Sequence, residues 1–256
     1  FHCHIRADRT GTLGVILEGL LGVNVSALYK DYELTTFSYY ETHRYKENID
    51  GIIEYINTLD GETLTDKFYT YCHKELGLSA KDIADFRQKM LGVVYPADVE
   101  NLVSEALSEK ATSIDLSNYT FEANALAGSM PDGSNLLVTV SPESGITGTN
   151  IINNDVCENL VLTDGSDFGA PDAFTTANAS YMTQVDSYRT LILPFEATVP
   201  ADFTVSKATS VTGTTVNLSA VTSVSANRPG LGQGEGLWGL TATNVAVPAT
   251  SSKLAE

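Results

Sequence analysis

The chain has 256 residues, with 15 basic and 32 acidic side chains and a formal net charge of −17 at pH 7. This excess of negative charge excludes duplex nucleic acid as the expected partner, because a phosphate backbone binds basic surfaces. Hydrophobic residues make up 43% of the chain, enough for one large or two ordinary domain cores, and no apolar run approaches the roughly 18 residues of a membrane-spanning helix.

The first stretch of the chain has the residues of a nucleophilic site that binds an anion. Residues 1–11 read FHCHIRADRTG, and five residues separate Cys3 from Arg9. The Arg9 guanidinium matches two phosphate oxygens, while backbone N–H groups and the N-terminus of a following helix supply further donors. We expect this positive environment to favour the thiolate form of Cys3. A thiolate that faces a bound phosphate is the starting point of a phosphatase reaction.

The pattern His2-Cys3-x5-Arg9-Thr10 resembles the signature of the cysteine-dependent protein tyrosine phosphatases. Residues 7–11 are similar to a bacterial branch related to the dual-specificity and lipid phosphatases. The resemblance continues through 20–23, 31–35, 86–87 and 90–91, and so covers about the first 92 residues. It implies an α/β phosphatase domain, of which this sequence holds the mostly helical C-terminal part. Most of the sheet is then expected before Phe1.

The resemblance also implies roles for the residues of this loop. Cys3 would be the nucleophile, with Arg9 and Asp8 as the other catalytic residues. The phosphate-binding set would be His4, Ile5, Arg6, Ala7, Asp8 and Arg9. His2 and Thr10 would support it: His2 by hydrogen bonding within the loop, and Thr10 either by donating its hydroxyl to the thiolate or by capping the next helix.

Two features of this chain depart from the family pattern. Arg6 stands where the family has Gly, at a position of unusual backbone dihedrals close to the phosphate. It either adds a second cation to the site or distorts the loop. The family takes its general acid, an Asp, from well upstream of the nucleophile, so we expect that residue before Phe1. Asp8 then has three open roles: to orient the loop, to pair with Arg6 or to replace the missing acid.

Apolar residues at spacings of three and four predict a series of helices after the loop, over 13–21, 24–34, 49–56, 64–76, 79–91 and 96–109. Asn24 and Ser79 are predicted N-caps. Gly22, Gly77 and Gly92 are predicted to follow helix ends. The last of these helices, 96–109, is expected to lead into a second domain.

The composition changes near residue 110. Basic residues become scarce, the remaining ones being Lys110, Arg189, Lys207, Arg228 and Lys253. Ser, Thr, Val, Asn and Gly become frequent. We therefore predict two domains: residues 1–109, the C-terminal part of the phosphatase-like domain, and residues 110–256, an accessory β module.

Short β-type runs predict strands at 135–140, 159–163, 190–193, 203–207 and 215–218, separated by turns such as 131–133 and 164–165. This pattern is typical of an all-β sandwich or jelly roll. Residues 157–165 and 188–195 are similar to a C-terminal module of secreted and surface proteins of Bacteroidetes. That resemblance implies a secreted, periplasmic or cell-surface protein, with cell-surface or glycan contact through this module.

The three cysteines do not form a disulfide framework. Cys3 must stay reduced to react, and we expect Cys72 and Cys157 to be buried core residues. His4 has no second ligand at metal spacing, so it is expected at the rim of the pocket. We expect neither a metal nor another cofactor.

Aromatic side chains offer two further candidate surfaces. Tyr39, Tyr40 and Tyr45 either line a substrate cleft or lie in an exposed loop. Trp238 either forms a sugar-binding platform or packs in the core of the β module.

Two functions are therefore open. The first is hydrolysis of phosphomonoesters on a protein, lipid or small-molecule substrate through a phosphocysteine. The second is a catalytically impaired protein that binds phosphate, or a surface adhesion or glycan-binding protein, in which Arg6 has disabled the loop. The residues do not choose among the possible substrates.

Overall fold

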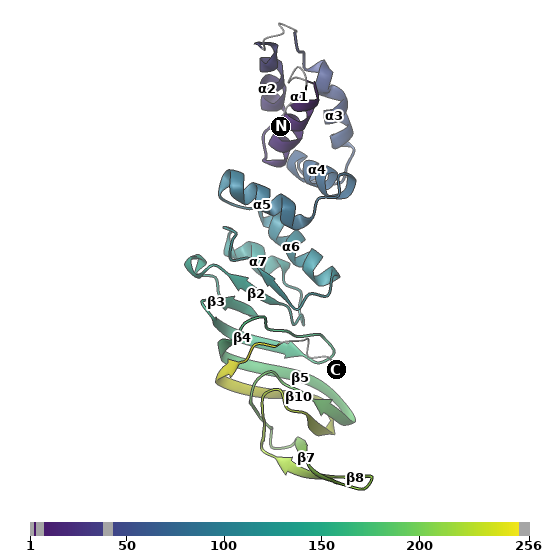
Figure 1. Ribbon diagram of the computed structural model, residues 1–256, viewed down its shortest axis with the longest axis vertical. Coiled ribbons are helices and arrows are strands. Elements are labelled where there is room, and N and C mark those ends of the chain that lie inside the picture. Colours follow the sequence, from purple (N-terminus) through teal and green to yellow (C-terminus); the bar gives the residue numbers. More distant parts are fainter. Residues whose placement is uncertain (1–2, 4–7, 38–42, 251–256) are drawn as a thin grey trace. The chain divides into compact units, whose positions relative to one another are not determined.

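The computed structural model describes residues 3, 8–37 and 43–250 (Figure 1). Contacts within the chain divide it into two compact units, Phe1–Val94 and Tyr95–Glu256. The first unit is helical, and the second is built on a large mixed sheet. In the part of the chain that the structure describes, no helix has the length and apolarity to cross a bilayer.

The first unit packs its helices around one core. Its elements are α1 (Asp8–Leu20), α2 (Val25–Leu34), the 3-10 turn η1 (Thr35–Phe37), α3 (Glu47–Asn57), α4 (Leu64–Thr70), the π-helical turn η2 (Tyr71–Glu75) and α5 (Ala80–Leu91). The buried side chains of this core include Leu20, Leu28, Ile53, Phe68 and Ile83. Within α3 the buried residues Ile49, Ile53 and Ile56 recur at helical spacing, and their burial confirms the apolar face predicted there.

The predicted helix ends are confirmed by their hydrogen bonds. The side chain of Asn24 accepts a bond of 3.0 Å from the Ala27 N–H at the start of α2. Ser79 and Asp82 form a capping box at the start of α5. Gly92 follows α5 with φ of +75°, a left-handed conformation that suits a residue without Cβ.

The predicted helix 64–76 changes its winding part-way. α4 ends at Thr70, and the π-helical turn η2 follows, with the Leu76 N–H bonded to the Tyr71 carbonyl oxygen at 3.1 Å. Cys72 lies in this turn and is buried, as predicted. Burial raises the pKa of its thiol to about 11, against a lowering effect of Arg87. Cys72 is therefore an inert core residue.

A buried arginine closes the far end of α1. The Arg87 side chain from α5 is 2% exposed, and its Nε donates a hydrogen bond of 2.9 Å to the Leu20 carbonyl oxygen. Its guanidinium also lies 5.9 Å from the centre of the Tyr69 ring. Because Leu20 is the last residue of α1, this cation meets the negative end of the helix dipole.

The second unit combines two helices with a mixed sheet. Its elements are α6 (Pro96–Ser108), β1 (Ser113–Asp115), α7 (Ala123–Ser129), β2 (Leu137–Val140), the 3-10 turn η3 (Pro142–Ser144), β3 (Ile151–Asn153), β4 (Val156–Thr163), β5 (Phe174–Leu191), β6 (Ala197–Thr198), β7 (Thr204–Thr212), β8 (Thr215–Val221), β9 (Ser223–Val224) and β10 (Gly230–Val247). Cys157 is buried in its core, as predicted.

The sheet follows the order β1-β2-β3-β4-β5-β10-β6-β9, and the hairpin of β7 and β8 joins it through β10. The pairs β1–β2, β2–β3 and β4–β5 are parallel, while β3–β4 and β5–β10 are antiparallel. The expected β-rich unit is therefore present. Its parallel pairs differ from a jelly roll, whose strands are antiparallel, and α6 and α7 make it a mixed rather than an all-β unit.

Helix α6 groups with the second unit, whereas the sequence placed it at the end of the first domain. Its apolar side chains Val99, Leu102 and Val103 are buried, and the helix contacts α7 and β1. The division between the compact units thus lies between Val94 and Tyr95. The change in composition near residue 110 instead falls between the end of α6 and the start of β1.

The strands predicted at 135–140, 159–163, 203–207 and 215–218 correspond to β2, β4, β7 and β8, and 190–193 overlaps the end of β5. Strand β10 was missed because its glycines resemble turn residues. In the structure these glycines make room for side chains. A Cβ at Gly232 would lie 2.6 Å from Phe203 Cζ, and one at Gly234 would lie 3.1 Å from Trp238 Nε1.

Candidate active site at the start of helix α1

Cys3 is held at the N-terminal end of α1. It is partly buried, and its backbone N–H donates a hydrogen bond of 2.8 Å to Thr10 Oγ1. Thr10 lies in the first turn of α1, where unpaired N–H groups and the positive end of the helix dipole favour an anion. The structure thus brings the predicted nucleophile to a helix end suited to phosphate.

The other described members of the predicted site lie on the same turn. Asp8 and Arg9 are the first two residues of α1, and both are exposed. Thr10 is inside the helix, so it does not cap it, and its oxygen accepts the bond from Cys3. Asp8 Oδ1 lies 3.7 Å from Nη2 of Arg44, which comes from the segment between α2 and α3.

The rest of the predicted loop lies outside the described residues. This applies to His2, His4, Ile5, Arg6 and Ala7. Their supporting and phosphate-binding roles therefore stay predictions. The same is true of the proposed pairing between Asp8 and Arg6.

Tyr32 of α2 forms a wall beside this turn. A Cβ at Gly11 would lie 2.7 Å from Tyr32 Cε2, so the ring packs directly on the α1 backbone. Burial raises the pKa of Tyr32, and the charge of Asp8 raises it further, while Arg44 acts in the opposite direction. The buried ring therefore lies close to both members of the Asp8–Arg44 pair.

Arg44 is the part of this site that the sequence reasoning missed. Its side chain is 8% exposed, and its backbone N–H donates a bond of 2.9 Å to Thr36 Oγ1 in η1. Within the described part of the chain, its Nε is buried without a hydrogen-bond partner. No local motif marks this residue, because only the packing of α2 against α1 brings it to Asp8.

The aromatic candidates separate into one exposed residue and one packed residue. Tyr45 is exposed and stacks on His43 with 6.1 Å between ring centres. Trp238 stacks on Phe203 at 4.9 Å and packs against the core of the second unit, which confirms its predicted packing role. Tyr39 and Tyr40 lie outside the described residues.

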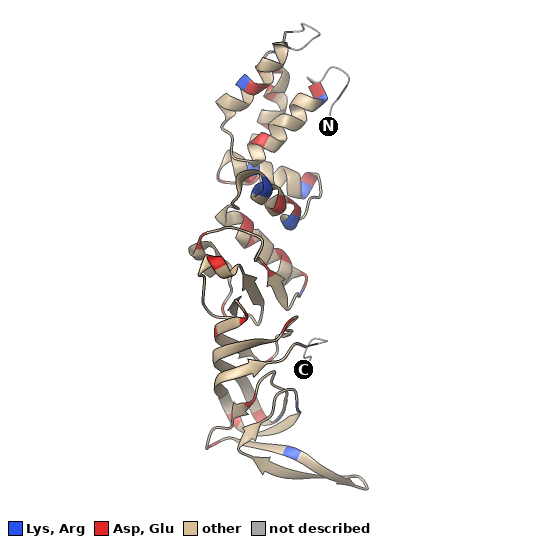
Figure 2. Cartoon of the chain, turned by 60° about the vertical axis from the view of Figure 1, so that its left-hand side comes forward, with Lys and Arg blue, Asp and Glu red and all other residues tan. Residues whose placement is uncertain are grey.

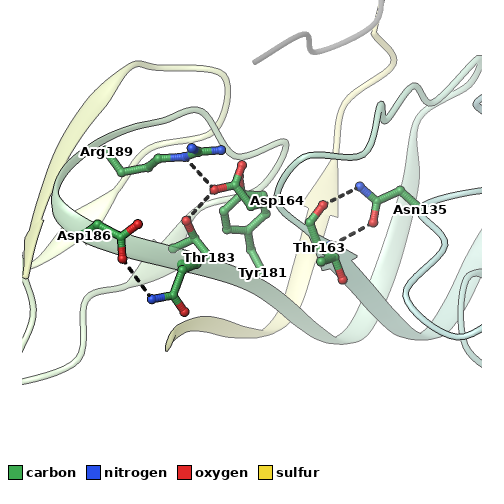
Figure 3. A network of polar contacts seen from close by, with 8 residues as sticks. Asn135, Thr163, Asp164, Tyr181, Thr183, Asp186 and Arg189 are labelled. Atoms are coloured by element: carbon green, nitrogen blue, oxygen red, sulfur yellow. Dashed lines mark hydrogen bonds and ion pairs between the residues drawn. The ribbon is translucent and has the colours of Figure 1, made fainter. Parts of the chain in front are cut away.

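A polar network in the second unit joins the ends of β4 and β5 (Figure 3). Asp164 accepts hydrogen bonds from Tyr181 Oη at 2.9 Å, Thr183 Oγ1 at 2.5 Å and Arg189 Nε at 2.8 Å. Burial alone would raise the pKa of Asp164, but these three hydrogen bonds lower it below its ordinary value. Asp164 and Arg189 belong to residues 157–165 and 188–195, the two segments singled out above from the sequence.

The network borders a cavity of about 270 Å³ that is also lined by Asn135, Leu162 and Phe168. The Asn135 amide donates to the carbonyl oxygens of Thr163 and Ser166, and accepts from the Thr163 N–H at 2.7 Å. The side chains of Asn135, Asp164, Tyr181 and Arg189 at this cavity are thus engaged within the chain. We assign these four to stability rather than to ligand binding.

Charge is distributed unevenly between the two units. Figure 2 shows Lys and Arg mainly on the helices of the first unit, with few on the strands of the second. In the described ranges, no three His, Cys, Asp or Glu side chains converge on a possible metal site.

Comparison with known proteins identifies the helical unit. Residues 1–92 match the model of the tyrosine phosphatase family. No significant match was found to a curated protein or to a solved structure. The matched region ends just before the division between the compact units, so it includes α1 to α5 and none of the sheet. Residues 1–92 are therefore similar to the tyrosine phosphatase family, whose members act on phosphorylated substrates.

Proposed function

We propose that this protein hydrolyses phosphomonoesters through a phosphocysteine intermediate, as a cysteine-dependent phosphatase of the tyrosine or dual-specificity type. The observation that carries the proposal is the hydrogen bond from the Cys3 N–H to Thr10. It holds the only cysteine of the signature motif at the N-terminal end of α1, within the segment that matches the family. A thiolate at this position faces an anion bound by the helix end.

In the first step the Cys3 thiolate attacks phosphorus in line, and the bond between phosphorus and the leaving oxygen breaks. The leaving oxygen takes a proton from a general acid. The Arg9 guanidinium and backbone N–H groups stabilise the equatorial oxygens. In the second step water attacks the phosphocysteine, which releases inorganic phosphate and restores the thiolate. Neither step requires a metal or another cofactor.

Asp8 is better suited to orientation than to proton donation. Its carboxylate lies 3.7 Å from the buried guanidinium of Arg44 and is engaged in that ion pair. We therefore assign the acid to an Asp outside the described site, as in the family. The substrate is a phosphorylated protein, lipid or small molecule.

The second unit is the basis for a proposal on where the protein is located. Its resemblance to a module of exported Bacteroidetes proteins supports a secreted, periplasmic or cell-surface location. The module would then place the phosphatase near its substrates through cell-surface contact. Fractionation of the native cells, with antibody detection of the protein, tests this location directly. Recovery in the cytosol alone would contradict it.

Turnover of a small aryl phosphate tests the activity. The assay should use the chain with any residues that the gene places before Phe1, together with Cys3→Ser and, as a matched control, Cys157→Ala. We expect Cys3→Ser to abolish turnover and Cys157→Ala to retain it, because Cys157 is buried in the second unit. Equal background rates in the native protein and Cys3→Ser would favour the alternative, a catalytically impaired phosphate-binding protein.

A further inference from the structure

We infer that Arg44 is a positioning residue of the phosphate site, and that it acts by neutralising Asp8. With this pair intact, an incoming phosphate dianion meets Arg9 and the first N–H groups of α1 without a fixed negative charge beside them. The inference rests on the proposed function and adds to it a residue from a distant segment.

The pair is unusual in its burial. The Arg44 side chain is 8% exposed, whereas that of Asp8 is 67% exposed, and the two charged groups are 3.7 Å apart. A buried guanidinium requires a compensating charge. Among the described residues Asp8 is the carboxylate within ion-pair distance, and the Arg44 Nε has no hydrogen-bond partner. The positive charge of Arg44 is therefore directed to the first residue of α1.

The fold fixes the position of Arg44. Its backbone N–H donates to Thr36 Oγ1 at 2.9 Å, and the same hydroxyl contacts the Arg44 carbonyl oxygen at 3.4 Å. Thr35 Oγ1 in turn donates to the Tyr32 carbonyl oxygen at 2.7 Å, which ties η1 to the end of α2. Arg44 is thus tied through η1 to the end of α2, the helix whose Tyr32 packs against α1.

Other ion pairs of the helical unit differ in kind. Lys74–Asp60 and Lys81–Asp85 join side chains that are exposed on both sides. Exposed pairs of this type contribute little, because water and salt screen them. The Asp8–Arg44 pair has one buried partner, so its loss would leave the Asp8 charge uncompensated next to Arg9.

The consequence for catalysis is an effect on binding more than on chemistry. Asp8 directly precedes Arg9 and carries the charge sign of the substrate. Without Arg44, the Asp8 carboxylate would repel the phosphate dianion in the ground state and in the transition state alike. Loss of such uniform binding raises KM and leaves kcat less affected.

The test is a double-mutant cycle with Arg44→Met and Asp8→Asn, read by KM and kcat for a small aryl phosphate. A second readout is the protection that inorganic phosphate gives against thermal unfolding. We expect Arg44→Met to raise KM about tenfold and to weaken phosphate protection equally. Adding Asp8→Asn should restore most of both, and Arg44→Lys should retain most of both. Failure of Asp8→Asn to restore either would overturn the inference and make Arg44 a direct phosphate ligand.

Asp8→Asn alone keeps the inference testable if Arg44→Met does not fold, since Asp8 is exposed. It should tighten phosphate binding, by about threefold, because Arg44 then has surplus charge; weaker binding would contradict the inference.

The inference and the proposed function can be refuted independently of each other. Turnover that depends on Cys3 but not on Arg44 refutes the inference alone. Phosphate protection that follows the cycle, without Cys3-dependent turnover, refutes the proposed function alone.

Discussion

The Nε of Arg87 donates a hydrogen bond of 2.9 Å to the carbonyl oxygen of Leu20, and so closes the end of α1 opposite to Cys3. Arg87→Met should reduce the free energy of unfolding by about 2 kcal/mol or more, because a buried carbonyl loses a charged donor. Lys89→Met, on the exposed face of α5, the helix that carries Arg87, is the control. Its expected change in the free energy of unfolding is below about 0.5 kcal/mol. Urea unfolding measures the free energy of unfolding of both variants. Equal decreases would show that the buried hydrogen bond does not stabilise the protein more than an exposed lysine does.

Two glycines of α1 give a matched pair of substitutions. Gly11→Ala should destabilise the helical unit by about 1–3 kcal/mol, because the new Cβ would lie 2.7 Å from the Tyr32 ring. Gly14→Ala has nothing within 4 Å of its Cβ and should stabilise the helix by up to about 1 kcal/mol. Thermal unfolding distinguishes the two. A stabilising Gly11→Ala would mean that Tyr32 moves away freely.

The Asp164 network predicts a dependence of stability on pH. Because the folded-state pKa of Asp164 is lowered, its contribution is present above the unfolded pKa of about 3.9 and is lost as the pH falls through the folded pKa. Asp164→Asn should therefore destabilise the second unit by about 1–2 kcal/mol at pH 7, and this difference should shrink in acid. The Asp164 side chain is 12% exposed, so screening by water is limited.

Asp186→Asn is the control for this pH series, because Asp186 is exposed and accepts a long hydrogen bond of 3.3 Å from Gln184. Its unfolding temperature should follow that of the native protein from pH 3 to pH 7. An Asp164→Asn difference that stays constant over this range would contradict the assignment.

The place of α6 can be tested by expressing two versions of the second unit. Residues 95–256 include α6, whereas residues 110–256 lack it. The shorter version would expose the surface that buries Val99, Leu102 and Val103, so we expect it to be insoluble or to unfold at a much lower temperature. Equal solubility and equal unfolding temperatures would instead support the domain boundary that the composition suggests.

The helical unit could largely be predicted from sequence because its signals are local. Asn24, Ser79 and Gly92 mark helix ends through bonds and dihedrals within a few residues. The apolar spacing of 49–56 marks the buried face of α3. The π-helical turn at Cys72 could not be predicted from the sequence, because a one-residue change of winding leaves the apolar spacing almost unchanged.

The remaining features depend on contacts between distant segments. From sequence alone Gly232 is typical of a turn. In the structure it lies in a strand, where the Phe203 ring occupies the space that a side chain would need. From sequence alone Arg44 is typical of a surface residue. In the structure it is buried and pairs with Asp8, which is distant in the sequence. The resemblance predicts site roles for Cys3 and Arg9, which lie on either side of the start of α1. No pattern in the sequence joins them to a residue after α2.

The bond from the Cys3 N–H to Thr10 also bears on inhibitor design. Because the amide of Cys3, the proposed nucleophile, is already engaged, a phosphate mimic bound at this site would draw its main-chain donors from the residues that follow Cys3. A compound that alkylates the thiol could leave this bond in place. Covalent inhibition would then block the site without releasing Cys3 from α1, and an alkylated protein should keep the thermal stability of its helical unit.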